Sequence, residues 1–182
     1  MIPESEINFM KNFLILLSLF FIFACQSESQ KSSDQFLKIV SLTTPYGDTI
    51  ETKLAITPSE QEQGLSGVRP EKFYDNQGLL FFYLEDDLRH FWMPDTYFDL
   101  DLIYVDKDFK ITDIIRKLPF YKGRANPDLI PRARGIWARH VLEMKSGSKI
   151  SEKLKIGDSL IWKGKLTLSE TENKIRQGIK SN

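Results

Sequence analysis

The sequence predicts a mainly β fold, α+β at most: one compact, antiparallel β-sandwich or barrel-like domain with one or two short helices. Short runs of alternating or continuous apolar residues recur along the chain, and clusters of Pro, Gly, Asn and Asp separate them. Only one segment carries a strong helix-start signal, and this pattern is typical of sandwiches and barrels. The 182 residues are enough for a single domain with a core of ordinary size.

The beginning of the chain predicts export. Residues 13–24 form an apolar run that is too short to span a bilayer but has the length of the hydrophobic region of a signal peptide. Lys11 supplies the positive charge that normally precedes this region. Two glutamates lie further upstream, where such a signal carries no negative charge, so translation starts either at Met1 or at Met10. We expect residues 1–24 to be a signal peptide.

Cys25 is the only cysteine, and its position predicts a lipid anchor. It directly follows Ala24 at the end of the apolar run, as in a bacterial lipobox, in which the cysteine is lipidated and becomes the mature N-terminus. Residues 25–35 are polar and Ser-rich, which predicts a flexible tether. We therefore expect attachment to a bacterial membrane through Cys25, on the periplasmic side. The alternative is an ordinary secretory signal with an unmodified cysteine.

Residues 36–163 are expected to form the β-rich domain, and it opens with a hairpin. Residues 36–42 and 49–56 have the composition of strands, and a Pro-Gly-Asp turn separates them. Residues 57–64 follow with a helix-start pattern: a threonine that can cap, a proline in the first turn, and a glutamate placed for a capping box. A glycine ends this short helix, and the continuous apolar run of residues 79–84 predicts a strand buried on both faces.

The clearest strand pattern is residues 98–105. Phe98, Leu100, Leu102 and Tyr104 share one face of it, and the other face carries Asp99, Asp101, Ile103 and Val105. A turn at residues 106–108 leads into residues 109–118, which predicts a second hairpin.

The last third of the domain begins with a long connection. Residues 119–135 contain three prolines and two glycines, and a connection of this length in a compact domain is typical of a binding loop or lid. Residues 136–144 are expected to form one strand, although their apolar spacing also fits a helix. A helical turn at residues 151–154 and a closing strand at 159–163 complete the domain. Residues 164–182 form a polar tail, with a weak helix expected across residues 170–177.

A series of short motifs runs in order through the domain: Glu60 to Leu65, Gly78 to Phe81, Phe91-Trp92-Met93-x-Asp95-Thr96, Leu100-Asp101-Leu102, Val105-Asp106, Val141-Leu142-Glu143 and Gly157-Asp158. This series resembles the signature of the bacterial and archaeal family called domain of unknown function 192. The resemblance covers residues 36–163, and it implies a compact, β-sandwich-like domain, often exported or lipid-anchored, with no established activity. In that pattern, Asn usually stands where Asp95 is and Pro where Asp99 is, so this site is more acidic than usual.

Aromatic, acidic and basic residues define a candidate ligand site. Asp101 would be the fixed group, the long loop would lie beside Trp92 and Asp101, and its arginines would meet an anionic small molecule or an envelope polymer. The candidate ligand-binding residues are Trp92, Met93, Asp95, Thr96, Asp101, Arg124, Arg132, Arg134 and Glu143.

The sequence carries no recognised catalytic motif, and we expect non-enzymatic binding of a small ligand, an envelope-derived ligand or a partner protein rather than catalysis. It has no serine elbow, phosphate-binding Gly loop, zinc spacing or catalytic cysteine, so neither a cofactor nor a metal is expected. Successive carboxylates on one strand face lie nearly 7 Å apart by strand rise, which also argues against a calcium site. The alternative is a hydrolase or transferase that uses Asp95, Asp101 and His90.

The charge pattern argues against a nucleic-acid partner, but it does not identify another partner. Lys and Arg together number 25, as do Asp and Glu, so the chain has no overall charge that would attract a polyanion. Residues 85–108 are acidic, whereas residues 116–139 contain seven basic residues and a single acid. These two segments either neutralise each other in the fold or leave the loop arginines free for an anionic partner.

Overall fold

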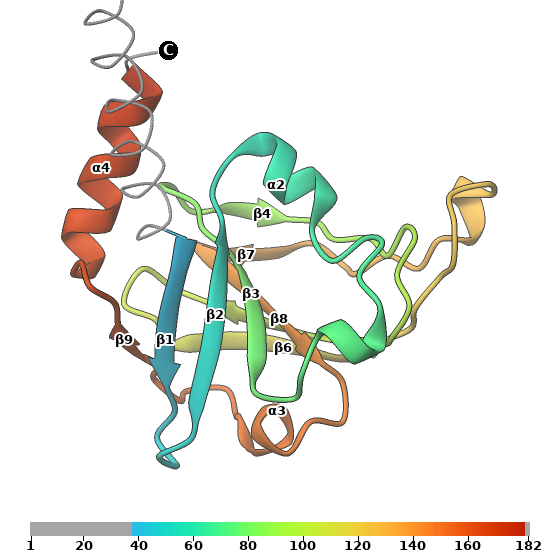
Figure 1. Cartoon of the computed structure of the whole chain (residues 1–182), viewed down its shortest axis with the longest axis horizontal. Helices are drawn as coiled ribbons and strands as arrows, with labels where there is room; N and C mark the ends of the chain where they lie inside the picture. The colour runs from blue at the N-terminus through green and yellow to red at the C-terminus, as the bar shows by residue number, and fades with distance from the viewer. Residues whose placement is uncertain (1–37, 181–182) are drawn as a thin grey trace, which may run out of the picture. The chain divides into compact units, whose positions relative to one another are not determined.

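The computed structural model describes residues 38–180 (Figure 1). The expected signal peptide, the Cys25 lipidation site and the tether lie outside these residues. The centre of the described chain is one seven-stranded sheet with the strand order β6-β5-β8-β3-β2-β1-β9. Its strands are β1 (Ile39–Thr43), β2 (Thr49–Ala55), β3 (Gln77–Phe81), β5 (Leu100–Val105), β6 (Ile111–Leu118), β8 (His140–Lys145) and β9 (Ile161–Lys163).

The large sheet curls until its two edge strands meet. Backbone hydrogen bonds join the start of β6 to the segment before β9: Ile111 N–H donates to Asp158 O, and Leu160 N–H donates to Phe109 O. Closing a sheet in this way satisfies the backbone groups that open edges would leave unpaired. The domain is therefore barrel-like, which is one of the two architectures that the sequence predicts.

Most strand pairs are antiparallel, as predicted, but β2 and β3 run parallel. The chain between them includes α2 (Pro58–Gln63) and a 3-10 helix at Pro70–Lys72, and such a connection is long enough to return the chain to the same end of the sheet. Thr57 and Glu60 form the expected capping box at the start of α2, and Gly64 caps its end.

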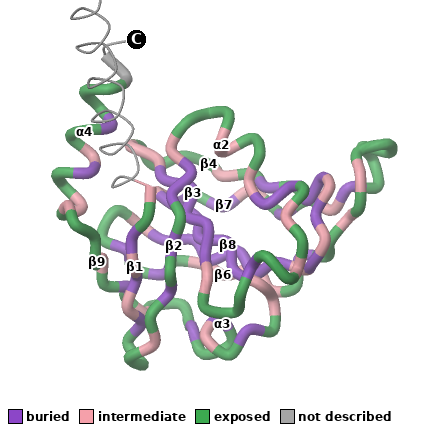
Figure 2. Tube along the Cα trace, in the orientation of Figure 1, coloured by how far each residue is buried: buried purple, intermediate pink, exposed green. Residues whose placement is uncertain are grey.

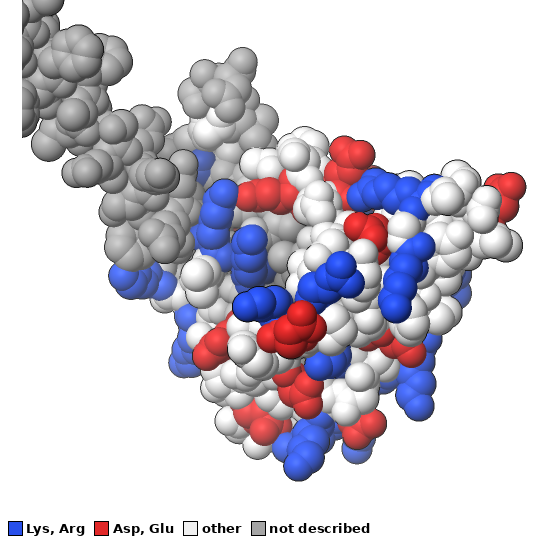
Figure 3. Space-filling view, turned by 45° about the vertical axis from the view of Figure 1, so that its right-hand side comes forward, with Lys and Arg blue, Asp and Glu red and all other residues white. Residues whose placement is uncertain are grey.

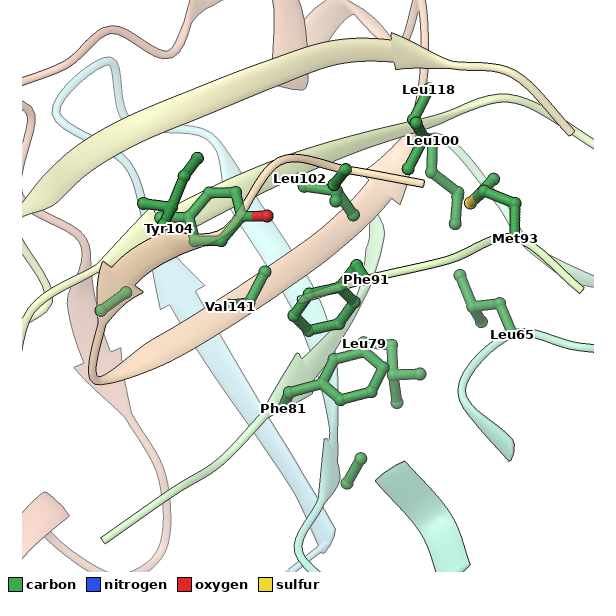
Figure 4. Packing of buried hydrophobic residues seen from close by; sticks show 14 of the residues in the cluster. Leu65, Leu79, Phe81, Phe91, Met93, Leu100, Leu102, Tyr104, Leu118 and Val141 are labelled. Atoms are coloured by element: carbon green, nitrogen blue, oxygen red, sulfur yellow. The ribbon is translucent and has the colours of Figure 1, made fainter. Parts of the chain in front are cut away.

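Two hydrophobic clusters lie on opposite faces of the sheet. The first, the barrel core, fills the inside of the curl, since all the strands around it contribute; it includes Leu42, Ile50, Leu80, Ile103, Leu142 and Leu160. The second, the outer cluster, lies on the opposite face of β3, β5 and β8 and is shown in Figure 4. These central strands are buried over most of their length because they are covered on both faces (Figure 2).

A second, two-stranded sheet belongs to the outer side. β4 (Asp87–Arg89) pairs with β7 (Ile136–Ala138). The sequence predicts one strand over residues 136–144, and this expectation is wrong: β7 leaves the large sheet, and β8 starts at His140. A run of apolar residues cannot show that its two halves pair with different partners, because each half fits a buried strand.

Two further helices complete the described part. α3 (Lys149–Lys153) begins at Ser148, whose hydroxyl accepts a hydrogen bond from Ser151 N–H. The C-terminal region, expected to be a polar tail, contains α4 (Leu168–Lys180), which includes the predicted helix. Ile175 packs into the barrel core, and Arg176 pairs with Glu85 at 3.2 Å.

The alternation predicted for residues 98–105 is confirmed. Phe98, Leu100, Leu102 and Tyr104 belong to the outer cluster, whereas Ile103 and Val105 belong to the barrel core. β5 lies between β6 and β8, and all six of its residues are buried. This strand and its neighbour β8 form the floor on which the candidate site is built.

Candidate functional site

The site begins with the aromatic segment of residues 91–93, which crosses over the outer cluster. Phe91 and Met93 are buried, while Trp92 points the other way and leaves 39% of its surface exposed. The ring of Phe91 packs edge-on against Phe81, with 4.7 Å between ring centroids (Figure 4). Met93 lies near Leu65 in the same view. The two inward side chains thus anchor the segment and hold the Trp92 ring at the surface.

The long loop packs against this segment, as predicted. Met93 N–H donates to Pro131 O, and Ala133 N–H donates to Phe91 O, so the loop runs antiparallel beside it. The Arg132 guanidinium lies 5.1 Å from the centroid of the Trp92 ring, within the range of a cation–π interaction. The backbone pairing therefore brings an exposed ring and an exposed cation together.

A groove of about 400 Å³ lies at this point, lined by His90, Phe91, Trp92, Arg132 and Ala133. A second hollow, the Glu143 cavity, has a volume of about 100 Å³. It lies between the end of α2, the end of β3, residues 90–96 and β8. The two hollows share three lining residues, His90, Phe91 and Trp92, so they adjoin one another.

Glu143 is the unusual group in this cavity. It lies on β8 among apolar neighbours and is only 4% exposed. Its Oε2 atom is buried and has no hydrogen-bond partner among the described residues. Because burial disfavours the charged carboxylate, the pKa of Glu143 is raised to about 8. A buried polar group without a partner is costly, and such groups are often completed by a ligand.

Gly64 helps to keep the Glu143 cavity open. It has a positive φ of 48°, which a glycine adopts without steric cost. A Cβ at this position would lie 3.2 Å from a Phe81 ring atom and 3.9 Å from Glu143 Oε2. A side chain would therefore intrude on the space in front of the carboxyl group.

Thr96 and Asp95 hold the loop in place. The Thr96 hydroxyl donates to Met93 O and accepts from Tyr121 N–H at 3.0 Å. Asp95 adopts a positive φ of 52°, a conformation that Asp and Asn tolerate better than most residues. Its carboxylate accepts hydrogen bonds from the Tyr97 hydroxyl and from Gly123 N–H. Thr96 lines the Glu143 cavity, whereas Asp95 lines neither hollow.

Asp101 is the fixed, hydrogen-bonded group that the sequence predicts, but it faces the barrel core. It accepts hydrogen bonds from the Ser151 hydroxyl at 2.6 Å, Arg116 at 2.8 Å and Lys117 N–H at 2.9 Å. Burial alone would raise the pKa of Asp101, but these hydrogen bonds outweigh it and hold the pKa below its usual range. The alternation of β5 places its side chain opposite Leu100, which does line the Glu143 cavity. Asp101 therefore serves to attach α3, and it lies outside both hollows.

The remaining arginines of the candidate set also lie outside both hollows. Arg134 pairs with Asp113 at 2.7 Å, and Arg124 is exposed. The acidic and basic segments do neutralise each other in part, since Arg116 pairs with Asp101 and Arg139 with Asp86. Figure 3 accordingly shows basic and acidic side chains interspersed over one face. Within the described residues, Arg132 forms no ion pair and is the basic residue of the groove.

The two histidines differ in role. His90 is exposed and lines both hollows. His140 is fully buried, stacks on Phe82, and accepts a hydrogen bond from Tyr83 N–H through Nδ1. Burial lowers the pKa of His140 to about 3, so this side chain is neutral at physiological pH.

The described residues contain neither a cluster of side chains suited to a metal ion nor a membrane-spanning helix. Between residues 38 and 180, no group of three or more His, Cys, Asp or Glu side chains is arranged to hold a metal ion. Over the same residues, no helix is long and apolar enough to cross a membrane.

Comparison with known proteins identifies the family. The sequence profile of DUF192, described as "Uncharacterized ACR", matches residues 40–162, which include the barrel and the site. The chain belongs to the DUF192 family. No curated protein sequence matches this DUF192 chain significantly.

Two solved structures resemble the DUF192 barrel. One is a Sinorhizobium meliloti protein provisionally named a transcription regulator; it is 28% identical with a TM-score of 0.53, and the match covers 69% of this chain and 92% of that one. The other is a Novosphingobium aromaticivorans protein of unknown function, also 28% identical, with a TM-score of 0.54 and coverage of 68% and 84%. Both share the fold over about two thirds of this chain.

Of the nine candidate ligand residues, the structure places Trp92, Met93, Thr96, Arg132 and Glu143 at the two hollows of the DUF192 domain. Sequence reasoning missed the role of Gly64, Phe81 and Tyr83, which lie at the end of α2 and at the end of β3. A signal for the cavity was present in β8, where a single acid interrupts the apolar run Val141 to Met144. An acidic residue in a strand buried on both faces predicts an unusual environment.

Proposed function

We propose that this DUF192 protein is a lipid-anchored, extracytoplasmic binding domain for a small or envelope-derived ligand. The anionic part of the ligand binds in the groove between Trp92 and Arg132. One observation carries the proposal: the exposed Trp92 ring and the Arg132 guanidinium, which forms no ion pair with the described residues, border the same groove. This groove adjoins the cavity in which Glu143 Oε2 has no hydrogen-bond partner among those residues.

The chemistry of the groove supports an anionic ligand with an apolar part. A guanidinium presents a planar set of donors that fits a carboxylate or phosphate through two hydrogen bonds. The Trp92 face offers apolar contact area at low conformational cost, as in many ligand sites. Within the groove lining no acidic residue opposes the positive charge of Arg132.

The alternative, a hydrolase or transferase, has less support. Of Asp95, Asp101 and His90, only His90 lines the hollows. Asp95 is bound to the loop backbone, and Asp101 is bound to Arg116 and Ser151 on the other face of β5. A general acid or base must reach the substrate, and these two carboxylates are already engaged elsewhere.

The test is capture of the ligand from cells. Full-length protein is purified from membranes in mild detergent, and native mass spectrometry measures any copurified mass on the wild type and on two arginine variants. Arg132→Lys keeps the charge but loses the planar fork, so we expect ligand occupancy to fall at least about tenfold. Arg134→Lys is the matched control, since Arg134 lies on the same loop but pairs with Asp113, and we expect its occupancy to equal that of the wild type.

The two sources of an anionic ligand give different results in this experiment. A free small molecule adds one defined mass, whereas an envelope polymer adds a ladder of masses separated by its repeat unit. Equal loss in Arg132→Lys and Arg134→Lys would mean that general basicity attracts the ligand, and the groove would then be the wrong site. Equal occupancy in all three proteins would also exclude the groove.

A further inference from the structure

We propose that the ligand is a zwitterion, whose ammonium group enters the Glu143 cavity while its anionic group binds Arg132 in the adjoining groove. This inference rests on the proposed ligand-binding function and specifies the chemical class of the ligand. Two observations support it. The Glu143 cavity is lined by acidic residues and the groove by Arg132, and Glu143 Oε2 has no hydrogen-bond partner among the described residues.

The lining of the Glu143 cavity suits a cation. It includes two acidic residues, Glu62 and Glu143, and neither a lysine nor an arginine. Four aromatic side chains, Phe81, Tyr83, Phe91 and Trp92, also contribute to it. The faces of aromatic rings carry partial negative charge and attract ammonium groups.

Glu143 Oε2 gives this cavity a specific point of attachment. The atom is buried and unpartnered among the described residues, so no protein group competes for it. A buried carboxylate is stable only when an opposite charge or good hydrogen bonds accompany it. An ammonium group would bring the charge and up to three donors in one step.

The charges around Glu143 leave room for such a group. Tyr83, after β3, and Tyr104, on β5, lie close enough to interact with the charge of Glu143, and burial raises the pKa of both, so they are neutral at pH 7. His90 and Glu62 face the same cavity from the aromatic segment and from α2. Arg89 lies over the Tyr83 ring, 3.6 Å from its centroid, and does not line the cavity.

The groove supplies the opposite end. Its lining contains Arg132 and His90 and has no acidic residue. The hollows adjoin along His90, Phe91 and Trp92, so one short ligand can reach both. Reversing the ligand would place its anion beside Glu143 and its cation beside Arg132, and like charges in both hollows oppose that orientation.

The direct test uses ω-amino acids with two to seven methylene groups between the ammonium and the carboxylate. Each is compared, by isothermal titration calorimetry, with the alkylamine and the alkyl carboxylate of the same length. We expect at least one ω-amino acid to bind at least about tenfold more tightly than either matching compound, because it fills both hollows at once. If no ω-amino acid has this advantage, the inference is overturned.

Two variants assign the ends of the ligand. Glu143→Gln keeps the shape of the side chain but cannot form the carboxylate, so we expect it to remove the advantage of the ω-amino acid over the carboxylate. Arg132→Gln should remove the advantage over the amine, and Arg134→Gln should change neither. If Glu143→Gln binds the ω-amino acid as well as the wild type does, a neutral hydrogen bond explains the site and the inference fails.

The number of protons released on binding distinguishes a ligand ammonium at Glu143 from a ligand group that only accepts a hydrogen bond there. An ammonium stabilises the carboxylate, so its binding at pH 6.5 should release close to one proton, seen as a binding enthalpy that differs between MES and Bis-Tris buffers. At pH 9 the release should be small. A ligand carbonyl held by the neutral acid would release no proton and would bind more weakly above about pH 8.

The failure of this inference differs from failure of the proposed function. If alkyl carboxylates bind the wild type, depend on Arg132, and gain nothing from an ammonium group, the groove binds anions and the zwitterion is excluded. If the whole series fails to bind, the zwitterion is again excluded, and ligand capture with Arg132→Lys decides the proposed function independently.

Discussion

Glu143 and His140 lie three positions apart on β8, and burial moves their pKa values in opposite directions. Both shifts have the same cause, since desolvation favours the neutral form of each group. His140 compensates with a hydrogen bond from Tyr83 N–H and with ring stacking. Glu143 faces the outer side, where Oε2 has no such partner within the described residues. His140 Nε2 also lacks a partner among the described residues, but His140 lines neither hollow, whereas Glu143 lines a cavity. At the residue scale, access to a cavity separates the candidate ligand group from the core histidine.

Glu143 predicts a pH dependence of stability in the absence of ligand. Its pKa is about 8 in the folded state against 4.5 as the ordinary value, so between these pH values the folded protein holds a proton that the unfolded chain has lost. The free energy of unfolding should therefore fall as pH rises, by about 1.4 kcal/mol per unit up to about pH 8. Urea unfolding at pH 6.5, 7.2 and 8.0 measures this slope. His140 is still partly protonated in the unfolded chain near pH 6.5 and adds a smaller, opposite slope there, which a comparison with a Glu143 variant cancels.

The matched variant for this prediction is Glu143→Gln, which cannot titrate. From pH 6.5 to 8.0, the free energy of unfolding of the wild type should fall by about 2 kcal/mol relative to that of the variant. Parallel curves for the two proteins would show that Glu143 is ionised in the fold across this range, which would require a partner for its carboxylate.

At the element scale, β5 shows how one strand serves two sides. Its outward residues form the floor of the outer cluster, and its inward residues complete the barrel core. Asp101 is the polar exception on the inward side, and it fastens α3 through Ser151 and Arg116. Arg116 also donates to the carbonyl oxygens of Ser151 and Leu154, so one ion pair orders the end of α3.

The two aspartates of this region predict very different mutational costs. Asp101→Asn should lower the free energy of unfolding by about 3 kcal/mol, because it removes the charge that partners the half-buried Arg116. Asp99→Asn should cost less than about 0.5 kcal/mol, since an amide oxygen can still accept the hydrogen bond from Phe120 N–H. Chemical denaturation of both variants at pH 7 measures the contrast. Similar losses in both would mean that Asp101 does not hold α3.

At the scale of the whole molecule, the barrel carries the site on its outside. The curled sheet buries its own core, so α2, the aromatic segment and the long loop can cover the opposite face of β3, β5 and β8 without closing it. The two hollows lie within this cover, where side chains from α2, the end of β3, the aromatic segment, β5, the long loop and β8 meet. Rigid strands beneath a loop-built surface are a common arrangement for binding sites.

The proposed membrane anchor predicts how the full chain partitions. Wild-type protein expressed in bacteria should enter the detergent phase of a Triton X-114 extraction, since a mature lipoprotein carries several acyl chains and one chain alone binds only marginally. Cys25→Ala should remain in the aqueous phase or accumulate as uncleaved precursor, and mass spectrometry of the N-terminus distinguishes these forms. Equal partitioning of both processed proteins would contradict the lipobox interpretation.

The sequence alone determined the local elements of this protein. The turn after β1, the capping box of α2 and the alternation of β5 depend on neighbouring residues, so they could be predicted from spacing and residue type. Glu143 belongs to a motif of the family resemblance, and Arg132 belongs to the basic loop. Alternation in the aromatic segment predicted that either Trp92 or the pair Phe91 and Met93 lines a pocket, and it could not say which.

Only the tertiary structure decided which of these residues meet. The parallel pairing of β2 with β3, the division of residues 136–144 between two sheets, and the closure of β6 on β9 all join segments far apart in the chain. The same closure turned Asp101 toward the barrel core and left Glu143 facing the cavity. Period-two alternation says which residues share a face, but a residue's partners depend on what covers that face, and only the folded chain determines this.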